Sequence, residues 1–384
     1  MKLLAIGSNG NGQLGLGHTE DVYRPHQVVD IPELQGDGIH VLDMAHTAGE
    51  SLLLLQDLSS SSAASPPILL STVSTGTFRP IYPQLPPLRA IKAGWDHIVA
   101  LDAEGQVWTW GGAQAKHGQL GRSGPGLPPA PVTSLPGPVK AIACGLRHTL
   151  ALLTTGQVYA WGCSRHGKSG DPVSPKDPST PRPLTLPSEQ DVVIEIACGT
   201  HHSLALLQDG RILGRGTNRL GQLGCSLSSS FSHWVPIPLP GLALSLSSGW
   251  SHALALVQVS PTSRTLYSWG REDLGQLGRT SSSSFKEPGP VTLPSSSSAS
   301  ILSYCCGSEH SLLLMASEDG NLLYGWGWNE HGNLGQDPCT SIPSPFAIPN
   351  PCKNQAMQVI YAGCGTTFIF LKEKQGSNDH PGEG

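Results

Sequence analysis

The stretch that decides the fold is Ala143-Cys144-Gly145-Leu146-Arg147-His148-Thr149-Leu150-Ala151-Leu152, which runs on to Gln157-Val158-Tyr159-Ala160-Trp161-Gly162. Its first half has the form Gly-x-x-His followed by small and aliphatic residues, and its second half ends in an aromatic-Gly or similar step. The first half occurs at Gly94/His97, Gly145/His148, Gly199/His202, Gly249/His252 and Gly307/His310. The second half ends at Gly111, Gly162, Gly216, Gly270 and Gly327. A fixed period of about fifty residues indicates a repeat architecture.

The two ends of the chain complete each other. Gly7 precedes Gly111 by two periods, so one decayed copy lies between them, near residues 44–80. Residues 361–368 form a first half with no second half after it, whereas the chain begins with a second half, Leu3 to Ile6. Pairing the two halves gives seven whole units in a closed ring, which leaves no unpaired strand edge. The sequence therefore predicts an all-β, seven-bladed propeller closed by the N-terminal strand.

Each unit is predicted to be a four-stranded antiparallel sheet. Gly156 lies between an apolar run and an alternating run, which is a hairpin signal, and Gly105, Gly210 and Gly320 hold the same place in their units. One unit cannot bury both faces of its sheet, so neighbouring units must stack. We expect one domain over residues 1–371 and a disordered tail over residues 372–384.

Composition narrows the functional classes. The formal net charge is −5 and only 13% of residues are charged, so the chain lacks an overall basic footprint for nucleic acid or an anionic membrane. No apolar run approaches the roughly 20 residues that span a bilayer. Because Met1 leads straight into the half-unit that opens the repeat array, we expect no signal or transit peptide. Cys144, Cys198 and Cys306 share one repeat position, which favours buried thiols and a cytoplasmic location, also extending to the nucleus.

No catalytic or metal-binding pattern emerges. The five repeat histidines belong to five different blades, so we expect each to make the same local hydrogen bond. The sequence has no Cys-x-x-Cys pair, no Gly-x-Ser-x-Gly elbow and no complete phosphate loop. We therefore expect no enzyme activity, no cofactor and no metal.

The remaining class of function is binding of a partner at the protein surface. The two residues between the repeat glycine and histidine vary, and equivalent positions in stacked units form a ring on one face. Tryptophan at two of these positions is typical of binding hot spots, although packing between the blades is the alternative. The predicted partner-binding residues are Trp95, Asp96, Arg147, His201, Trp250 and Glu309.

The recurring phrase Gly-x-x-His, Trp-Gly and Gly-Gln-Leu-Gly resembles the regulator of chromosome condensation repeat family over nearly the whole chain. The resemblance implies a seven-bladed propeller that binds proteins. The founding type of the family promotes guanine-nucleotide exchange on a small nuclear-transport GTPase, but usually carries a basic tail that this chain lacks. The plant ultraviolet-B photoreceptor joins tryptophan and arginine in Gly-Trp-Arg-His-Thr, and no unit here has both.

A third member, the fungal alpha-tubulin suppressor protein, is similar in its opening segment. Gly7-Ser8-Asn9 and the run from Gln13 to His18 match it, and both chains are propellers almost without tails. This resemblance implies binding to a small CSL-type zinc protein that carries electrons for diphthamide synthesis and for Elongator-dependent modification of tRNA wobble uridines. It implies a monomer or heterodimer without direct contact to nucleic acid or membrane. Nucleotide exchange on a small GTPase is the alternative, and a general interaction scaffold is the third.

Overall fold

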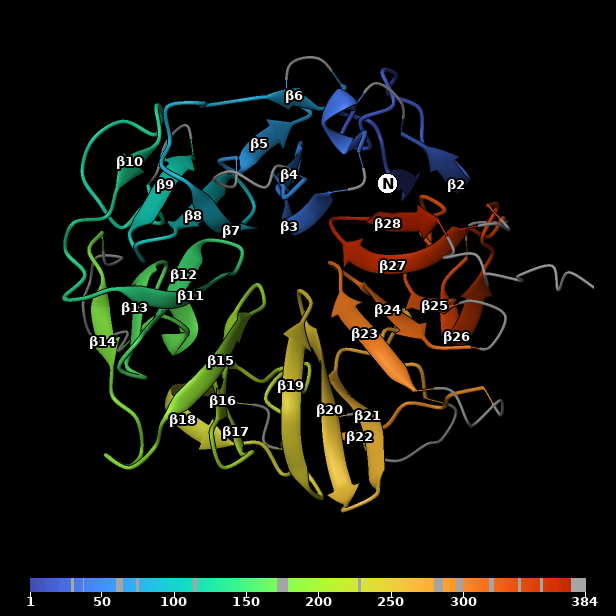
Figure 1. The fold of residues 1–384 in the computed structure, drawn as a ribbon. Coiled ribbons are helices and arrows are strands. Elements are labelled where there is room, and N and C mark those ends of the chain that lie inside the picture. The colour runs from blue at the N-terminus through green and yellow to red at the C-terminus, as the bar shows by residue number, and fades with distance from the viewer. Residues whose placement is uncertain are drawn as a thin grey trace, which may run out of the picture.

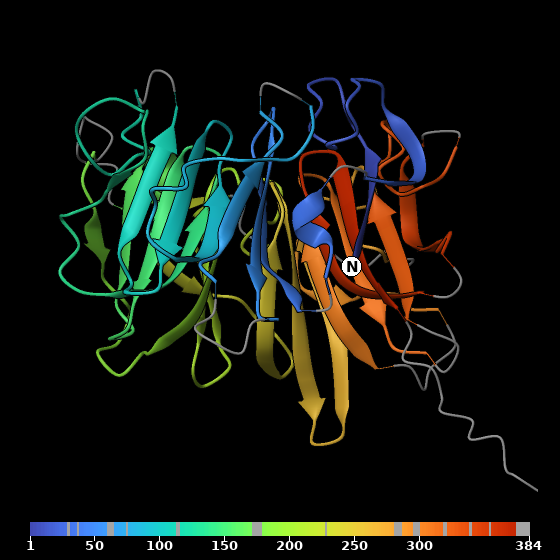
Figure 2. The ribbon, with the colours of Figure 1, turned by 45° about the horizontal axis from the view of Figure 1, so that its top comes forward.

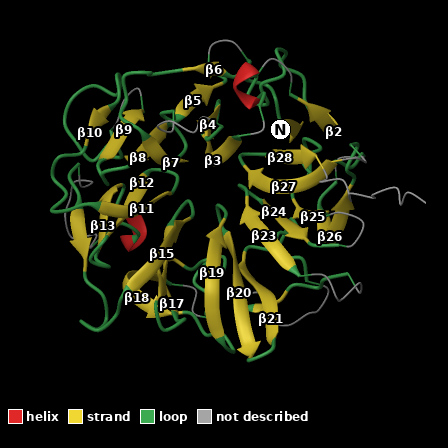
Figure 3. Cartoon of the chain, in the orientation of Figure 1, coloured by secondary structure: helices red, strands yellow, loops and turns green. Residues whose placement is uncertain are grey.

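Seven four-stranded antiparallel sheets surround a central channel, as Figure 1 shows. This computed structural model describes residues 1–28, 31–36, 38–59, 65–73, 76–112, 116–170, 179–226, 229–279, 286–294, 300–317, 321–337, 340–352 and 355–373. The all-β propeller predicted from the repeat is confirmed. Within the described residues, helix is limited to the short 3-10 turns η1 (Pro32–Leu34) and η2 (Arg165–Gly167), drawn red in Figure 3. Neither is long and apolar enough to cross a membrane.

The blades are numbered from the one that closes the ring. Blade 1 combines β27 (Gln355–Ala362), β28 (Thr366–Glu373), β1 (Lys2–Gly7) and β2 (Val22–Gln27). Blade 2 has β3 (Ile39–His46), β4 (Ser51–Asp57), β5 (Ile68–Ser71) and β6 (Arg79–Pro80). Blade 3 has β7 (Leu88–Ala93), β8 (His97–Asp102), β9 (Val107–Gly111) and β10 (Ala130–Pro131). Blade 4 has β11 (Val139–Cys144), β12 (His148–Leu153), β13 (Val158–Gly162) and β14 (Arg182–Leu184).

The remaining blades follow the same order. Blade 5 has β15 (Val193–Cys198), β16 (His202–Leu207), β17 (Ile212–Thr217) and β18 (Ser230–Pro236). Blade 6 has β19 (Leu242–Ser248), β20 (His252–Ser260), β21 (Ser263–Gly270) and β22 (Gly289–Pro290). Blade 7 has β23 (Ile301–Cys306), β24 (His310–Met315), β25 (Leu322–Gly327) and β26 (Ile342–Ile348). In every blade the first strand named lies nearest the channel (Figure 1).

The N-terminal strand closes the ring as predicted. β1 pairs antiparallel with β28, with Leu3 opposite Phe370 and Ile6 opposite Thr367. β28 continues to Glu373, two residues past the expected end of the propeller, and the rest of the predicted tail lies outside the described residues.

The core is divided among the junctions between blades. Buried apolar side chains form seven clusters, one at each junction. At the junction of blades 4 and 5, Leu150 and Leu152 of β12 pack with Val193 and Ile196 of β15. Alternate residues of a strand face opposite sides of the sheet, so an apolar strand such as β12 supplies both of its junctions. This arrangement explains why a single unit could not fold alone.

The Trp-Gly step fastens one blade to the loop of the blade before it. Trp161, Trp269 and Trp326 are fully buried. Their indole N–H groups donate to the backbone carbonyls of Gln119, Gln222 and Gln276, at 2.9, 3.1 and 2.8 Å. These three glutamines belong to the Gly-Gln-Leu-Gly loops of the preceding blades. The two halves of the repeat phrase thus meet across a junction.

Four repeat histidines make the same hydrogen bond, as expected, but its partner lies in the next blade, so the bond is not local. His97 Nε2 lies 3.1 Å from Thr149 Oγ1, and His148 Nε2 lies 2.9 Å from Ser203 Oγ in the next blade. The same bond joins His252 to Ser311 and His310 to Thr367. Blade 6 has Ala253 at the hydroxyl position, and His202 bonds instead to Ser248 of β19, at 3.0 Å.

Blade 1 lacks a repeat histidine, and His46 of blade 2 enters its place. The His46 ring stacks on Phe368 with centroids 5.0 Å apart, and a Cβ on Gly363 would touch both this ring and Thr366. Sequence reasoning missed His46 because it precedes the turn of its own blade instead of following it. At the junction of blades 1 and 2, a histidine from a different repeat position therefore fills the place of the repeat histidine.

Replacing the repeat glycine should destabilise the fold. A Cβ on Gly145 would collide with the His148 ring and with the Gly199 carbonyl of the next blade. We expect Gly145→Ala to lower the free energy of unfolding by about 2 kcal/mol, because the packed junction cannot expand freely. Gly137→Ala, where a Cβ would meet nothing within 4 Å, is the matched control. Urea unfolding of both variants measures the difference, and equal stabilities would contradict the steric explanation.

Candidate protein-binding face

The turn face of the propeller carries the predicted partner-binding residues. We define the turn face as the turns between the first and second strands of the blades together with the loops between their third and fourth strands. The Gly-x-x-His turns and the Gly-Gln-Leu-Gly loops both lie there, because successive strands of each blade are antiparallel. The opposite face carries the second hairpin of each blade and is called the hairpin face. Figure 2 shows the ring tilted, with loops on both faces.

The turns on this face are joined by backbone hydrogen bonds from blade to blade. Trp95 N donates to Leu146 O at 3.1 Å, and Trp250 N donates to Ser308 O at 2.9 Å. Thr200 N donates to Trp250 O at 2.9 Å, so Trp250 is held from both neighbouring blades. The backbone around the variable residues is therefore fixed, while their side chains are free to differ. A rigid support of this kind lowers the entropy cost of binding.

Trp95 and Trp250 meet although they come from blades 3 and 6. Their ring centroids lie 5.7 Å apart with an interplanar angle of 51°. Trp95 remains 42% exposed and Trp250 is half-buried. Because the two blades lie on different sides of the channel, the pair extends over its mouth at the turn face. The tryptophans therefore do not pack between adjacent blades. Such packing was the alternative prediction.

The other four predicted residues contact loops of the same face. Asp96 accepts a hydrogen bond from Gln119 Nε2 at 3.3 Å, and exposed Arg147 lies 3.1 Å from His117 Nε2. His201 Nδ1 lies 3.3 Å from Lys168 Nζ. Nearby positive charge and burial lower the pKa of His201 to about 4, with burial the larger cause.

Glu309 differs because its side chain is buried. It accepts hydrogen bonds from Arg271 at 3.1 Å and from Gln276 at 2.8 Å, and desolvation raises the pKa of its carboxyl. Glu309 is thus held within the loop of blade 6 and presents little surface to a partner. The structure brings the two tryptophans together and leaves the other four spread around the ring. Their roles in binding remain predictions.

The loop residues that orient these side chains were missed from the sequence. Gln119, Lys168 and Gln276 occupy equivalent places in three loops, and each contacts a predicted residue. The available signal was the Gly-Gln-Leu-Gly phrase itself, where Lys168 replaces the glutamine in blade 4. In these three loops the second residue of the phrase supports a side chain of the variable ring.

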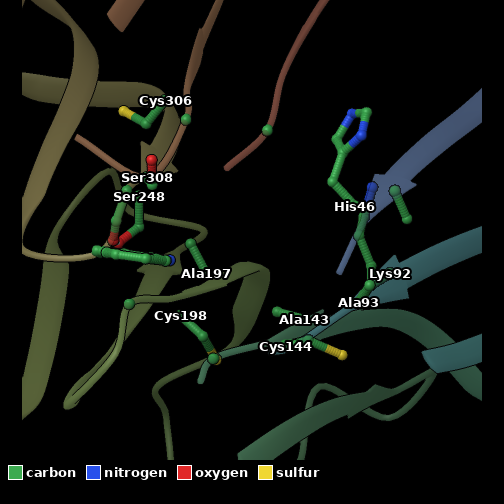
Figure 4. A pocket seen from close by; sticks show the side chains of 18 of the residues that line it. His46, Lys92, Ala93, Ala143, Cys144, Ala197, Cys198, Ser248, Cys306 and Ser308 are labelled. Atoms are coloured by element: carbon green, nitrogen blue, oxygen red, sulfur yellow. The ribbon is translucent and has the colours of Figure 1, made fainter. Parts of the chain in front are cut away.

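The central channel contains a cavity of about 380 Å³ lined by the first strands of all seven blades, part of which Figure 4 shows. Lys92 Nζ lies 2.9 Å from the Asp43 carboxylate, and Asp43 also accepts the backbone N–H of Ile91 at 3.0 Å. Glu195 likewise accepts the backbone N–H of Leu246 at 3.2 Å. Desolvation raises the pKa of Glu195 to about 7, and this hydrogen bond only partly opposes it.

Thiols of the channel wall are held protonated. Burial raises the pKa of Cys144 and of Cys306 to about 12, and it raises the pKa of Cys198 well above its usual value. A protonated thiol is a poor nucleophile and a poor metal ligand. Within the described residues, no three His, Cys, Asp or Glu side chains gather in a way that could hold a metal ion.

Comparison with known proteins agrees with this geometry. The family model described as the RCC1-like domain matches residues 73–371, which is more than half of the chain. The chain belongs to the RCC1-like domain family. Among its relatives, the mouse secretion-regulating guanine nucleotide exchange factor is 30% identical over an alignment that covers 94% of this chain and 82% of the relative.

Two solved structures share the fold. Prp20p from Saccharomyces cerevisiae, described with its binding to Gsp1p and histones, superposes with a TM-score of 0.78 and 22% identity, covering 97% of this chain and 92% of Prp20p. Human WBSCR16 superposes with a TM-score of 0.76 and 18% identity, covering 97% of this chain and all of that chain. At these identities the likeness concerns the propeller alone.

Proposed function

We propose that this RCC1-like protein has no catalytic residues of its own and works by binding another folded protein on its turn face. The observation that carries the proposal is the contact between Trp95 and Trp250 over the channel mouth. Partly exposed aromatic rings on a fixed backbone supply large contact area at low entropy cost, which is typical of binding hot spots. Both partner classes considered below are intracellular, and we propose a cytoplasmic location with a nuclear fraction.

One partner class is a small GTPase whose nucleotide exchange the propeller would promote. The 30% identity to the mouse exchange factor, which extends over nearly the whole chain, supports this class. Exchange by binding requires no catalytic residue on the propeller. It requires only that the nucleotide-free GTPase bind more tightly than the loaded one.

The other class is the small CSL-type zinc protein of diphthamide synthesis and Elongator-dependent tRNA modification. The opening segment supports it, because the matching run ends at exposed His18 on the turn face of blade 1, followed by exposed Glu20. Part of that match has a structural cause. Buried Asn9 accepts the Leu14 N–H at 2.9 Å, as Asn218 and Asn329 accept equivalent N–H groups in blades 5 and 7.

Affinity purification of the tagged protein from its native cells, with mass spectrometry of what copurifies, separates the classes. A stoichiometric small zinc protein would lead to diphthamide and tRNA assays. A stoichiometric GTPase would lead to release of a fluorescent GDP analogue from it, with and without the propeller. Recovery of neither protein would contradict both partner assignments.

Truncating the tryptophan pair should weaken binding without unfolding the protein. We expect Trp95→Ala or Trp250→Ala to reduce affinity for the captured partner about 30-fold, because a central aromatic anchor contributes about 2 kcal/mol. Leu242→Ala is the matched control, since Leu242 is 56% exposed on blade 6 at the start of β19, away from the turn face. Isothermal titration measures the affinities and thermal unfolding checks the fold. Unchanged affinity in both tryptophan variants would exclude the pair from the interface.

A further inference from the structure

Charge is unevenly distributed around the turn face. In blades 3, 4 and 5, its described turns and loops comprise residues 94–96, 112, 116–129, 145–147, 163–170, 179–181, 199–201, 218–226 and 229. These segments contain six Lys and Arg against one Asp, a net charge of +5. We call them the basic arc. The corresponding described segments of blade 6, residues 249–251, 271–279 and 286–288, contain three of each kind and are neutral.

The remaining blades carry the opposite charge. In blades 7, 1 and 2 the described turns and loops comprise residues 307–309, 328–337, 340–341, 363–365, 8–21, 47–50, 72–73 and 76–78. They contain six acidic residues and no Lys or Arg: Glu20, Asp21, Glu50, Glu309, Glu330 and Asp337. We call them the acidic arc. The two arcs occupy different sides of the ring, with the tryptophan pair over the channel between them.

The basic arc presents its charge to solvent. Arg147, Arg165 and Arg219 are all exposed, and they come from blades 4 and 5. Arg165 and Arg219 act on the same ring, because burial, Lys168, Arg219 and Arg165 in that order lower the pKa of His166. The His166 and His201 rings contact each other at a centroid distance of 5.7 Å. A neutral pair of imidazoles thus lies among arginines that repel each other and favour an incoming anion.

Resting on the proposed function, we propose that the two arcs select and orient the partner. The partner is a folded protein that places an acidic patch on Arg147, Arg165 and Arg219 and a basic patch on the acidic arc, with its centre on Trp95 and Trp250. Complementary charge of this kind steers encounter and suppresses the reversed orientation. A nucleic acid fits less well, because a continuous polyanion across this face would meet the exposed carboxylates of Glu20, Glu330 and Asp337.

Charge reversal tests the proposal directly. The arc variant is Arg147→Glu/Arg165→Glu/Arg219→Glu, and the control variant is Lys140→Glu/Arg264→Glu/Lys372→Glu. The control changes the same total charge at exposed residues near strand ends on the hairpin face. Fluorescently labelled decaglutamate, decalysine and a single-stranded DNA 20-mer are titrated against each protein at low salt. Thermal unfolding confirms that both variants remain folded.

We expect the arc variant to bind decaglutamate at least tenfold more weakly than the wild type, and the control variant to bind it within twofold. The difference should shrink as salt is added, because exposed charges are screened. Equal losses in both variants would overturn the proposal. So would DNA binding that the arc variant abolishes while decaglutamate fails to bind the wild type.

Capture of the partner by the three proteins is an independent test of the proposal. The arc variant should lose the partner that the wild type and the control variant retain. If all three proteins retain it, the proposed orientation is wrong while the proposed function stands. If the wild type captures none, the proposed function fails, and the peptide titrations still decide whether the arc is a binding surface for acidic protein.

Discussion

Acidification from pH 8 to pH 5.5 is expected to lower the free energy of unfolding, and the repeat histidines with Glu195 account for about 5 kcal/mol of this loss. The cause is the set of repeat histidines, which are fully buried at the junctions between blades. Burial lowers the pKa of His202 and His252 to about 3 and that of His97 and His310 to about 4. It lowers the pKa of His148 well below the usual value, with nearby Lys168 the next cause.

The hydrogen bonds explain why these rings stay neutral. Ser203 Oγ donates its hydrogen to the Lys168 carbonyl at 2.9 Å, so it accepts from His148 Nε2. Ser311 Oγ likewise donates to the Gln276 carbonyl and accepts from His252. The proton is thus assigned to Nε2, and Nδ1 of both rings has no hydrogen-bond partner among the described residues. Protonating Nδ1 would bury an unpaired charge.

The sign of the pH effect follows from the lowered pKa. Above the unfolded-state pKa near 6.5 both states are neutral and the stability is complete. Below it the unfolded chain takes up protons that the folded chain refuses, so stability is lost as pH falls. Each of the five groups contributes about 1.4 kcal/mol at pH 5.5, together about 7 kcal/mol.

The contribution of Glu195 to the pH dependence of stability has the opposite sign and is smaller. Its folded-state pKa of about 7 lies above the unfolded value of 4.5, so the folded chain binds the proton first. Acidification through this window therefore stabilises the fold, by about 2 kcal/mol at pH 5.5, which gives the net loss of about 5.

Urea unfolding at several pH values, followed by tryptophan fluorescence, measures the effect. The slope of unfolding free energy against pH should correspond to uptake of about three to four protons on unfolding near pH 5.5. A stability that stays constant between pH 8 and pH 5.5 would show that the histidines are not kept neutral.

The repeat allowed most of the fold to be predicted from the sequence. Gly-x-x-His and Trp-Gly recur because each has a fixed place in a blade, and counting their spacing gave the number of blades and the closing strand. Partnerships across the junctions were not predictable in the same way. His202 finds Ser248 and His46 replaces the missing histidine of blade 1, and neither follows the repeat phase. In both cases a place in the junction is filled by a side chain from a different sequence position than in the other blades.

The candidate site was predictable in place but not in detail. Variation between the repeat glycine and histidine located the ring on one face. The sequence gives no distance between blades 3 and 6, so the contact of Trp95 with Trp250 required the structure. Glu309 has the same repeat position as Arg147, yet the loop of blade 6 buries it. Burial there depends on Arg271 and Gln276, which lie in a different repeat.

Trp161→Ala is expected to lower the free energy of unfolding by about 3–5 kcal/mol. Trp161 is fully buried at the junction of blades 3 and 4, where it packs with Val99 and Leu101 of β8. Truncation leaves a cavity between two sheets. Because each sheet is linked to both of its neighbours, the propeller cannot contract to fill this cavity. The Gln119 carbonyl also loses the indole N–H at 2.9 Å.

Two further variants separate these causes. Trp161→Phe keeps most of the apolar contact and removes the donor, so it should cost about 1–2 kcal/mol. Trp95→Ala removes a tryptophan that is 42% exposed and should cost less than about 1 kcal/mol. Urea unfolding at pH 8 ranks the three variants. If Trp95→Ala destabilised the protein as much as Trp161→Ala, the tryptophan pair would be part of the fold and not a surface kept for a partner. The predicted order therefore distinguishes the residue that joins blades from the residues that remain available for binding.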